Sequence, residues 1–571
     1  MRNGRIGMER EIIASDSVPA LCGERESRKR NEGMETPARK MGNGKTEEGK
    51  NRIVRDLTSG NVARTMIWFA APLFLSSLLQ TTYNMADMII IGHFVGKEGV
   101  AAASIGGDVL LFASFVAMGF ANAGQVIISQ LVGAGRHDKV NRLIGTMFTV
   151  LLCCAMLIGS LGLIFQETLL QWLNTPPEAL EYTRAYTDVC LTGLIFIYGY
   201  NVVSAVLRGM GDSKHPFYFI ALATGLNVVL DLVLVVGFRM AIFGVALATV
   251  ISQAVSFCWA VTFLYRRKTA FGFDFKLRSF AVDREVLIPF LKLGIPMMIQ
   301  GASIDFSKLF VNAWINSYGV LATAMTGIGN KVGSVVNVVN VALSTAGSSM
   351  IGQCIGAEKY ERVPKVLKVS FSINIAISLA MGIVTVLFPS MVFGIFTGDA
   401  EVLKLSLRYI PVALLLFAGS ALSPPMSSLI NGSGNFKLNL AVALLDGVFM
   451  RIGLSALLGL GFAFGVYGFW YGSALASFTP FVIGGVYFLS GRWRTRKYLI
   501  RDEAPDKIPS WPPPPASLSF VYLPTDKKGI RIATLKNRIV EVSYPVGIFC
   551  RKLRSAASPA TIKTTIRIPG P

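Results

Sequence analysis

Charge and catalytic residue types are both scarce in this sequence. Only 16% of its 571 residues are charged, against about 25% in soluble globular domains. It contains three scattered histidines, and its seven cysteines form no CxxC pair, so a zinc centre, a disulfide framework and a serine–histidine dyad are not indicated. The first 60 residues contain no apolar run typical of a cleavable signal peptide. These absences argue against a soluble multidomain protein and against an enzyme, and no cofactor or metal is expected.

Apolar residues, by contrast, are abundant and clustered. They make up 52% of the chain, and the mean hydropathy is +0.53. Runs of about 20 apolar residues, long enough to cross a bilayer as a helix, recur from Met66 to Leu489. The sequence therefore predicts an all-α membrane protein with twelve transmembrane helices. The predicted spans are 66–94, 104–132, 143–171, 182–207, 217–238, 241–265, 287–317, 320–351, 367–396, 404–430, 437–460 and 463–489.

The positive charge is concentrated in loops and tails. The net charge is +21, but basic residues between apolar runs indicate membrane topology rather than nucleic-acid binding. Connections after even-numbered spans are basic, as in 136–142 and 266–284. The connections on the other side contain few basic residues, namely Lys97, Arg184, Arg239 and Lys404. The positive-inside rule then predicts that both termini lie on the cytoplasmic side. The protein is expected in the inner (cytoplasmic) membrane.

The chain contains an internal repeat. Residues 128–135 (ISQLVGAG) align with 351–358 (IGQCIGAE), and 209–211 align with 432–434 at the same offset. Six spans separate equivalent positions, so the halves have parallel topology and would be related by an axis along the membrane normal. The predicted organisation is a disordered charged leader (1–60), an N-terminal six-helix bundle (61–270), a basic cytoplasmic linker (271–286), a C-terminal six-helix bundle (287–492) and a disordered basic tail (493–571).

Ionisable residues inside the apolar runs are the main functional signal, because each costs about 2.5–3.5 kcal/mol at mid-helix on insertion scales. Gln80, Tyr83, Asn84 and Asp87 recur at spacings of three and four and therefore share one helical face. This face is interpreted as a cation or proton site beside a cavity. A carboxylate that is simply hydrated near the outer interface is the alternative.

A second polar pair lies in the fifth predicted span. Asn227 and Asp231 are four residues apart and face one way. Carboxylate, amide and hydroxyl oxygens are hard ligands that suit a proton or sodium rather than a soft metal. The alternative is an amide that only satisfies a buried carboxylate.

Two further pairs of charged residues are ambiguous. Asp305 and Lys308 are spaced to pair with each other or to form a functional site. Asp446 and Arg451 are five residues apart, and interhelical pairing is the simpler interpretation.

Two prolines interrupt apolar helices. Pro72 lies in the first span and Pro296 in the seventh, where each removes one backbone hydrogen bond. Each could be a moving hinge or a static kink.

These motifs together resemble the multidrug and toxic compound extrusion (MATE) family over about residues 56–490, most closely its DinF-like branch. The residues that carry the resemblance are Pro72, Leu79-Gln80, Tyr83-Asn84, Asp87, Ile91-Gly92, Ser129-Gln130, Gly133-Ala134-Gly135, Arg208-Gly209-Met210-Gly211-Asp212, Asn227 to Asp231 and Gly244 to Thr249.

The resemblance implies two pseudo-symmetric six-helix bundles around a central cleft that opens alternately to the two sides of the membrane. It implies export of organic cations and drugs in exchange for protons or sodium. Asp87 matches the family's coupling residue, Asn227, Asp231 and Thr249 match its companions, and Pro72 matches a proline in a helix that bends. The substrate cavity is expected to include Gln80, Tyr83, Asn84 and Ser204.

The sequence departs from the family pattern at one place, and one alternative function stays open. Another branch of the family uses an acidic residue of the seventh helix, and Asp305 lies near that place but one position away, beside Lys308. A lipid or oligosaccharide-lipid flippase could share the architecture, but it would need several basic side chains for phosphates. Only Lys308, Lys331 and Arg451 are candidates. The expected partners are cationic or amphipathic drugs and the lipid bilayer, and the protein is expected to be a monomer.

Overall fold

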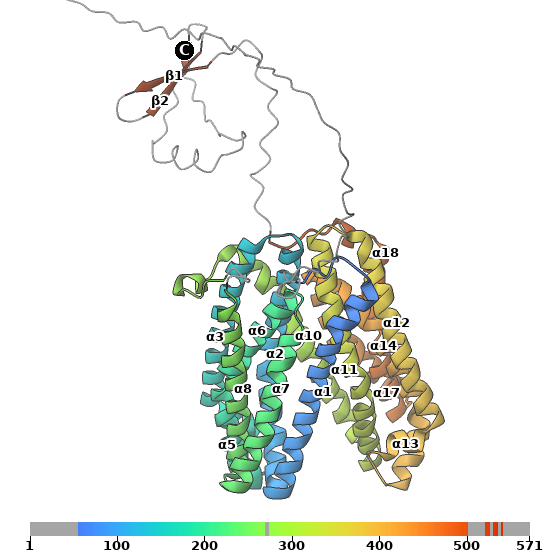
Figure 1. Ribbon diagram of the computed structural model, residues 1–571. Coiled ribbons are helices and arrows are strands. Elements are labelled where there is room, and N and C mark those ends of the chain that lie inside the picture. The colour runs from blue at the N-terminus through green and yellow to red at the C-terminus, as the bar shows by residue number, and fades with distance from the viewer. Residues whose placement is uncertain (1–54, 269–272, 501–519, 526–528, 535–537, 541–571) are drawn as a thin grey trace, which may run out of the picture. The chain divides into compact units, whose positions relative to one another are not determined.

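The computed structural model describes residues 55–268, 273–500, 520–525, 529–534 and 538–540. Within these residues, eleven helices are long and apolar enough to cross a membrane, and two helices that meet at a bend of 45° can supply a twelfth span. The structure thus confirms the predicted all-helical membrane fold (Figure 1).

The N-terminal half contains the first six spans. They are α1 (Val62–Phe94), α2 (Lys97–Gly133), α3 (His137–Ile164), the bent pair α5 (Pro177–Thr192) and α6 (Leu194–Gly209), α7 (Lys214–Asp231) with its π-helical extension η2 (Leu232–Gly237), and α8 (Ala241–Arg266). A short helix, α4 (Gln166–Trp172), precedes α5. The bend lies at Gly193, where any Cβ would collide with the Val250 side chain of α8.

The C-terminal half repeats this arrangement. Its spans are α10 (Arg284–Asn316), α11 (Val320–Gly356), α12 (Val363–Leu387), α14 (Ala400–Gly432), the irregular span α15–η5–α16–η6 (Phe436–Leu444, Leu445–Met450, Arg451–Ala456, Leu457–Gly461) and the pair α17 (Val466–Ala476) and α18 (Thr479–Leu489). Shorter elements are η3 (Leu277–Phe280), η4 (Tyr360–Arg362), α13 (Pro389–Gly394) and η7 (Arg492–Thr495).

Local sequence signals define the helix ends. Asn61 caps α1 by accepting a hydrogen bond from the Arg64 amide, and Asp283 caps α10 in the same way. Gly96 and Gly319 precede α2 and α11 with φ of 94° and 97°, a conformation that other residues rarely adopt. Equivalent signals at equivalent places reflect the internal repeat.

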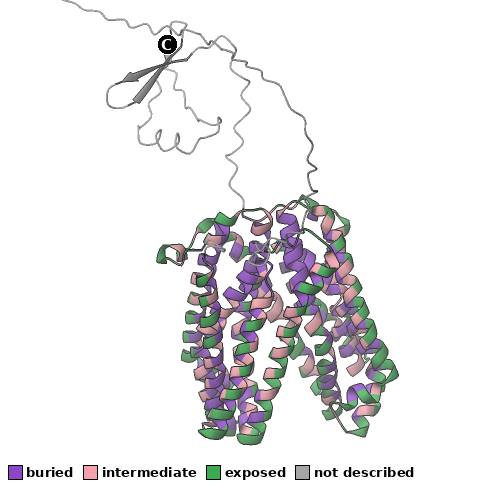
Figure 2. Cartoon of the chain, viewed as in Figure 1, coloured by how far each residue is buried: buried purple, intermediate pink, exposed green. Residues whose placement is uncertain are grey.

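The first helix of each half contributes to the buried cores of both halves. The first turns of α1 pack into a core of the C-terminal half, whereas Ile90 and Ile91 at its other end join a core of the N-terminal half. α10 does the reverse: Phe290 belongs to the N-terminal core and Ile315 to the C-terminal core. Each half therefore begins with a helix that crosses from one core to the other. Figure 2 shows the buried residues inside the helical body and the exposed ones on its outer faces.

The two halves are joined by reciprocal hydrogen bonds at the end of the helical body where the described helical chain starts and stops, here called the chain-end side. Gln130 of α2 donates through Nε2 to the Gly432 carbonyl at 2.8 Å, and Gln353 of α11 donates to the Gly209 carbonyl at 3.5 Å. Each glutamine also accepts from a flanking segment. Leu57 N donates to Gln353 Oε1 at 2.9 Å, and Leu499 N donates to Gln130 Oε1 at 3.0 Å. These four contacts are called the glutamine latch.

The latch gives a reciprocal prediction. Gln353→Ala should speed hydrogen exchange at the Leu57 amide about tenfold, because a lost hydrogen bond of this kind is worth roughly 1–1.5 kcal/mol. The Leu499 amide should be unaffected. Gln130→Ala should produce the opposite pattern, and peptide-level exchange with mass spectrometry measures both. Equal acceleration at both amides in either variant would contradict separate contacts.

The flanking segments are more ordered than the sequence indicates. Leu57, Trp493 and Ile500 are buried against the helical body, so the predicted leader and tail boundaries at residues 60 and 493 lie within packed chain. The remaining leader, residues 1–54, lies outside the described residues.

The tail also contains regular structure. Strands β1 (Phe520–Thr525), β2 (Gly529–Thr534) and β3 (Arg538–Val540) form an antiparallel sheet in that order. Phe520 lies opposite Thr534, and Ile532 lies opposite Val540. The sequence predicted a disordered tail over residues 493–571 and did not predict these three strands.

Candidate functional site

The predicted coupling residues meet inside the N-terminal half. Asp87 lies in the second half of α1, and Asn227 and Asp231 lie one turn apart near the end of α7. α1 packs against α7, and α7 packs against α8, which carries Thr249. Both carboxylates are buried, with exposed fractions of 9% for Asp87 and 0% for Asp231.

The Asn227 amide bridges the two carboxylates. With its nitrogen turned toward them, Nδ2 donates to Asp87 Oδ1 at 2.9 Å and to Asp231 Oδ2 at 3.2 Å. The opposite atom of the amide faces the Thr249 hydroxyl, 3.5 Å away. That hydroxyl also lies 3.3 Å from the Tyr83 hydroxyl. Five oxygen-bearing side chains from three helices thus form one connected group, called the coupling cluster.

Within the described residues, no basic side chain pairs with the coupling cluster. The ion pairs formed within the described residues involve other carboxylates, such as Glu285 with Lys139 and Asp446 with Arg451. Asp231 Oδ1 is buried and has no hydrogen-bond partner in the described part of the chain. A buried carboxylate without a basic partner is costly unless it takes up a proton or a cation.

A cavity of about 390 Å³ opens beside the coupling cluster. This volume falls in the usual range for small-molecule sites, roughly 300–1,000 Å³. Asp87, Tyr83 and Thr249 form part of its wall, and none of the lining residues is a lysine or an arginine. The lining residues are Gln80, Tyr83, Asn84, Asp87, Met88, Ile91, Ala103, Gly107, Leu110, Leu111, Ser114, Met118, Tyr186, Ile197, Val245, Thr249 and Gln253.

The cavity places three of the four predicted substrate residues together and leaves one out. Gln80, Tyr83 and Asn84 line it. Ser204 does not line it, although Ile197 of the same helix α6 does, and Ser204 is fully buried. Ser204 is therefore not part of this cavity.

Three polar lining residues were not predicted, namely Ser114, Tyr186 and Gln253. Gln253 lies four residues after Thr249 on α8, so the same helical spacing that grouped the α1 residues could have found it. Tyr186 lies on α5, and nothing in its local sequence signals that α5 reaches the cavity.

The secondary candidates lie elsewhere. Lys308 Nζ donates to Asp305 Oδ1 at 2.9 Å, so these two residues pair with each other, and both side chains are at least one-third exposed. Asp446 and Arg451 also pair, at 3.0 Å, despite their five-residue spacing. A π-helical turn at η5 brings them to one side of the span. Neither pair contacts the cavity.

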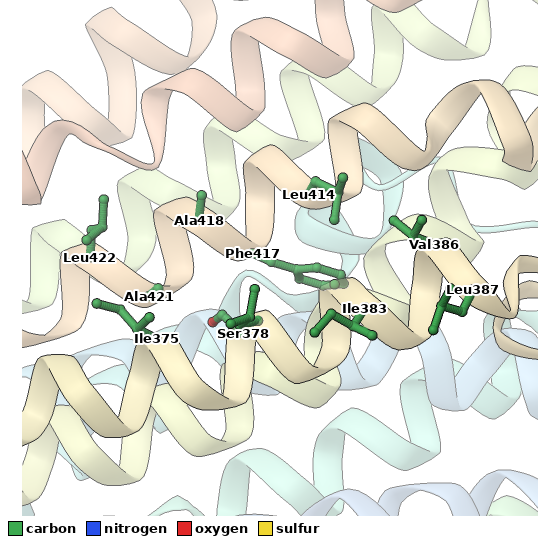
Figure 3. Close-up of a pocket in the computed structure, with 12 residues that line it drawn as sticks. Ile375, Ser378, Ile383, Val386, Leu387, Leu414, Phe417, Ala418, Ala421 and Leu422 are labelled. Carbon is green, nitrogen blue, oxygen red and sulfur yellow. The ribbon is translucent and has the colours of Figure 1, made fainter.

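A second cavity, of about 500 Å³, lies between α12 and α14 (Figure 3). Ser378 is its one polar lining residue, and the others are apolar or glycine. Ile375, Leu379 and Leu387 on its rim are exposed, as expected for a surface that faces lipid. None of its lining residues is charged.

The described residues contain no group of three or more His, Cys, Asp or Glu side chains placed to hold a metal ion. The coupling cluster pairs two carboxylates with amide and hydroxyl oxygens, a donor set for protons or alkali cations.

Comparison with known proteins agrees with this geometry. The MatE family model matches residues 72–233 and 296–457, one segment in each half. The chain is 29% identical over 390 residues to the probable multidrug resistance protein YoeA of Bacillus subtilis (strain 168), covering 67% of this chain and 84% of that protein. It is 31% identical to the probable multidrug resistance protein YpnP of the same organism over 54% of this chain and 68% of that protein.

Solved structures share the fold. A transporter of the MOP superfamily from Pyrococcus furiosus superimposes with a TM-score of 0.70 at 23% identity, covering 78% of this chain and 98% of that one. An outward-facing multidrug resistance MATE family transporter gives the same score over 77% and 97%. The matched segments span more than half of the chain and include the spans that carry Asp87, Asn227 and Asp231. The chain therefore belongs to the MatE family of multi-pass membrane transporters, the multidrug and toxic compound extrusion family that its motifs resemble.

Proposed function

We propose that this protein is a secondary antiporter that exports organic cations in exchange for protons or sodium. The observation that carries the proposal is a pair of buried carboxylates, Asp87 and Asp231, that share one amide and have no basic partner in the described chain. One of them, Asp87, also forms part of the wall of a cavity of drug size. The same acidic group can therefore be reached from a cavity that admits a ligand.

The chemistry of the cavity favours a lipophilic cation. Met88, Leu110 and Leu111 offer apolar contact, whereas Tyr83 and Tyr186 offer aromatic faces that attract cations. Asp87 is the one ionisable carboxylate in the lining, and no basic side chain accompanies it. A phosphate headgroup would find no positive partner there, so a lipid-linked substrate is not favoured.

Coupling follows from competition for the carboxylates. While Asp87 and Asp231 are charged, they attract a cationic drug into the cavity. A proton or sodium ion that arrives at the cluster neutralises them, and the attraction for the drug falls. Asn227 and Thr249 keep the two carboxylates within reach of one ion. No covalent step is required.

The available driving force is adequate. A pH difference of one unit is worth about 1.4 kcal/mol per proton, and each charge gains about 2.3 kcal/mol per 100 mV of membrane potential. One or two ions per drug molecule could therefore sustain a drug gradient of about tenfold or more.

α1 offers a route from the site to the rest of the molecule. Pro72 interrupts its backbone hydrogen bonding near the end of the part packed in the C-terminal core, and the part that carries Asp87 follows. Ion binding at Asp87 could thus change the angle between the two parts, with Pro72 as the hinge. We assign the chain-end side to the cytoplasm, because the basic connections at residues 136–142 and 359–368 lie there, and we expect the protein to function as a monomer in the inner membrane.

The proposal is tested by drug efflux from proteoliposomes under separate gradients. A fluorescent cationic dye should be exported when a pH gradient or a sodium gradient is imposed, and one of the two should suffice. Collapsing that gradient with the matching ionophore should stop export. Dye movement that is the same with and without both gradients would contradict antiport.

A further inference from the structure

The internal repeat assigns each residue of the coupling cluster a counterpart in the C-terminal half. The two segments matched by the family model begin and end 224 residues apart. This shift places Arg451 at the position of Asn227 and Ser473 at the position of Thr249.

The structure supports this correspondence through side-chain contacts. Arg451 Nη1 donates to the Ser473 hydroxyl at 3.1 Å, just as an amide atom of Asn227 lies 3.5 Å from the Thr249 hydroxyl. In both halves a side chain of the fifth span meets a hydroxyl of the sixth span. The two places are therefore equivalent in space as well as in sequence.

The charges at the two places are different. In the N-terminal half the cluster contains two carboxylates and no base. In the C-terminal half Arg451 Nη2 donates to Asp446 Oδ1 at 3.0 Å, and the side chains are 7% and 5% exposed. The counterpart of Asp231 is Ser455, and the counterpart of Asp87 is apolar at either offset, Val311 at 224 or Phe310 at 223. One carboxylate and one fixed cation thus replace two carboxylates.

A π-helical turn places the counter-charge. Before η5, Gly432 lies 223 residues after its counterpart Gly209. After η5, Arg451 lies 224 residues after its counterpart Asn227. η5 contains the extra residue, and Asp446 lies within it. Gly447 presses η5 against α10 so closely that a Cβ there would collide with Ser303. π-helical turns of this kind are frequent at functional sites.

Lys308, which lies near this pair, is already engaged. Lys308 of α10 adds positive potential at Asp446, but its ammonium is held by Asp305 at 2.9 Å and is half exposed. Arg451 is the group in direct contact with Asp446. An arginine side chain stays protonated in proteins, so this cation cannot be released.

We infer that Arg451 is a tethered cation, which takes in the C-terminal half the place that an exchangeable cation takes in the N-terminal half. The C-terminal half is thereby held in a permanently cation-loaded form, and only the N-terminal half exchanges ions. This inference rests on the proposed function for its account of the N-terminal site.

The inference assigns Arg451 and Asp446 positioning roles that differ from those of an ordinary buried ion pair. An ordinary pair would contribute only to folding, and buried pairs are weak evidence of stability by themselves. A tethered cation predicts in addition that its removal exposes a site for a free cation, made by Asp446, Ser473 and the new side chain.

The main experiment uses the full chain with Asp87→Asn and Asp231→Asn, in which the N-terminal site is removed. Melting temperature in detergent is compared in sodium chloride and in N-methyl-D-glucamine chloride at equal ionic strength and pH. Arg451→Asn should add a sodium-dependent rise of about 2 °C or more. Arg451→Lys should show none, because it keeps a tethered cation. Arg451→Asn with Asp446→Asn should also show none, because it lacks the carboxylate.

A second measurement does not depend on the folding of the Arg451→Asn variant. The Asp87→Asn, Asp231→Asn protein with an intact C-terminal half should bind no ²²Na⁺. Bound ²²Na⁺ that disappears on adding Asp446→Asn would overturn the inference, and so would a folded Arg451→Asn variant with no sodium response. Absence of cation-dependent transport in the wild-type protein would instead contradict the proposed function, and it leaves these two measurements of the C-terminal half interpretable.

Discussion

Asp87→Asn should reduce gradient-driven drug efflux by more than about tenfold while leaving the amount of folded protein unchanged. Two unit charges about 4 Å apart attract by roughly 4 kcal/mol at an effective dielectric constant near 20, and 1.4 kcal/mol already changes an equilibrium tenfold. Asparagine keeps the size of the side chain and can still accept from Asn227, but it offers no charge to the drug and no proton site. Efflux from proteoliposomes and the yield in size-exclusion chromatography provide the two measurements.

Asp188→Asn is the matched control. Asp188 lies on α5, a neighbouring helix of the same half, but it does not line the cavity or contact the coupling cluster. It should transport as well as the wild-type protein. Asp87→Glu keeps the charge and should retain partial activity. Full efflux by Asp87→Asn, with a gradient dependence like that of the wild type, would show that the carboxylate at this position is not needed for coupling.

The spans were predictable because their signal is local. About 20 apolar residues form a membrane helix whatever surrounds them, so each predicted span overlaps an observed helix. The predicted spans 143–171 and 367–396 nevertheless run past the ends of α3 and α12, over the short helices α4 and α13. The face shared by Tyr83, Asn84 and Asp87 follows from helical spacing alone. Gln253 follows from the same rule applied to α8, where Thr249 marks the face.

Features that depend on neighbours were not predictable. Hydropathy does not show that α1 begins in one core and ends in the other, because both cores are equally apolar. Ser204 illustrates the same limit: a small hydroxyl residue in an apolar helix can face a cavity or the helix core, and only packing decides which. The pairing of Asp446 with Arg451 needed the π-helical turn, which helical spacing does not include.

Gly356→Ala should lower the stability of the closed chain-end side, although alanine is the better helix former. Gly356 of α11 lies where a Cβ would collide with the Gln130 carbonyl of α2, and Gly133 of α2 meets the Gln353 carbonyl of α11 in the same way. The obstacle is backbone, so no side-chain rotation relieves it. Overpacking of this kind costs about 1–3 kcal/mol, which outweighs the gain in helix propensity. The melting temperature in detergent should therefore fall.

Gly327→Ala on the same helix separates the two effects. No heavy atom outside its own helix lies within 4 Å of the Cβ position at Gly327, so propensity alone acts there and should raise stability by about 0.5–1 kcal/mol. Two identical substitutions on one helix are thus expected to shift the melting temperature in opposite directions. A rise in both would mean that the crossing of α2 and α11 can relax at no cost.

Cys354 provides a native reporter for the same crossing. It is fully buried next to Gln353 in the closed arrangement, and it should become reachable if the two halves separate at the chain-end side. With the other cysteines replaced by serine, labelling of Cys354 by a charged maleimide should be faster in Gly356→Ala than in the parent and unchanged in Gly327→Ala. A transporter that alternates between two openings must break this contact in every cycle. Gly356→Ala weakens only the closed form of this end, so it should shift the population toward the form that opens here. If the melting temperature falls but Cys354 labelling stays slow, the substitution lowers the stability of the fold without opening this end.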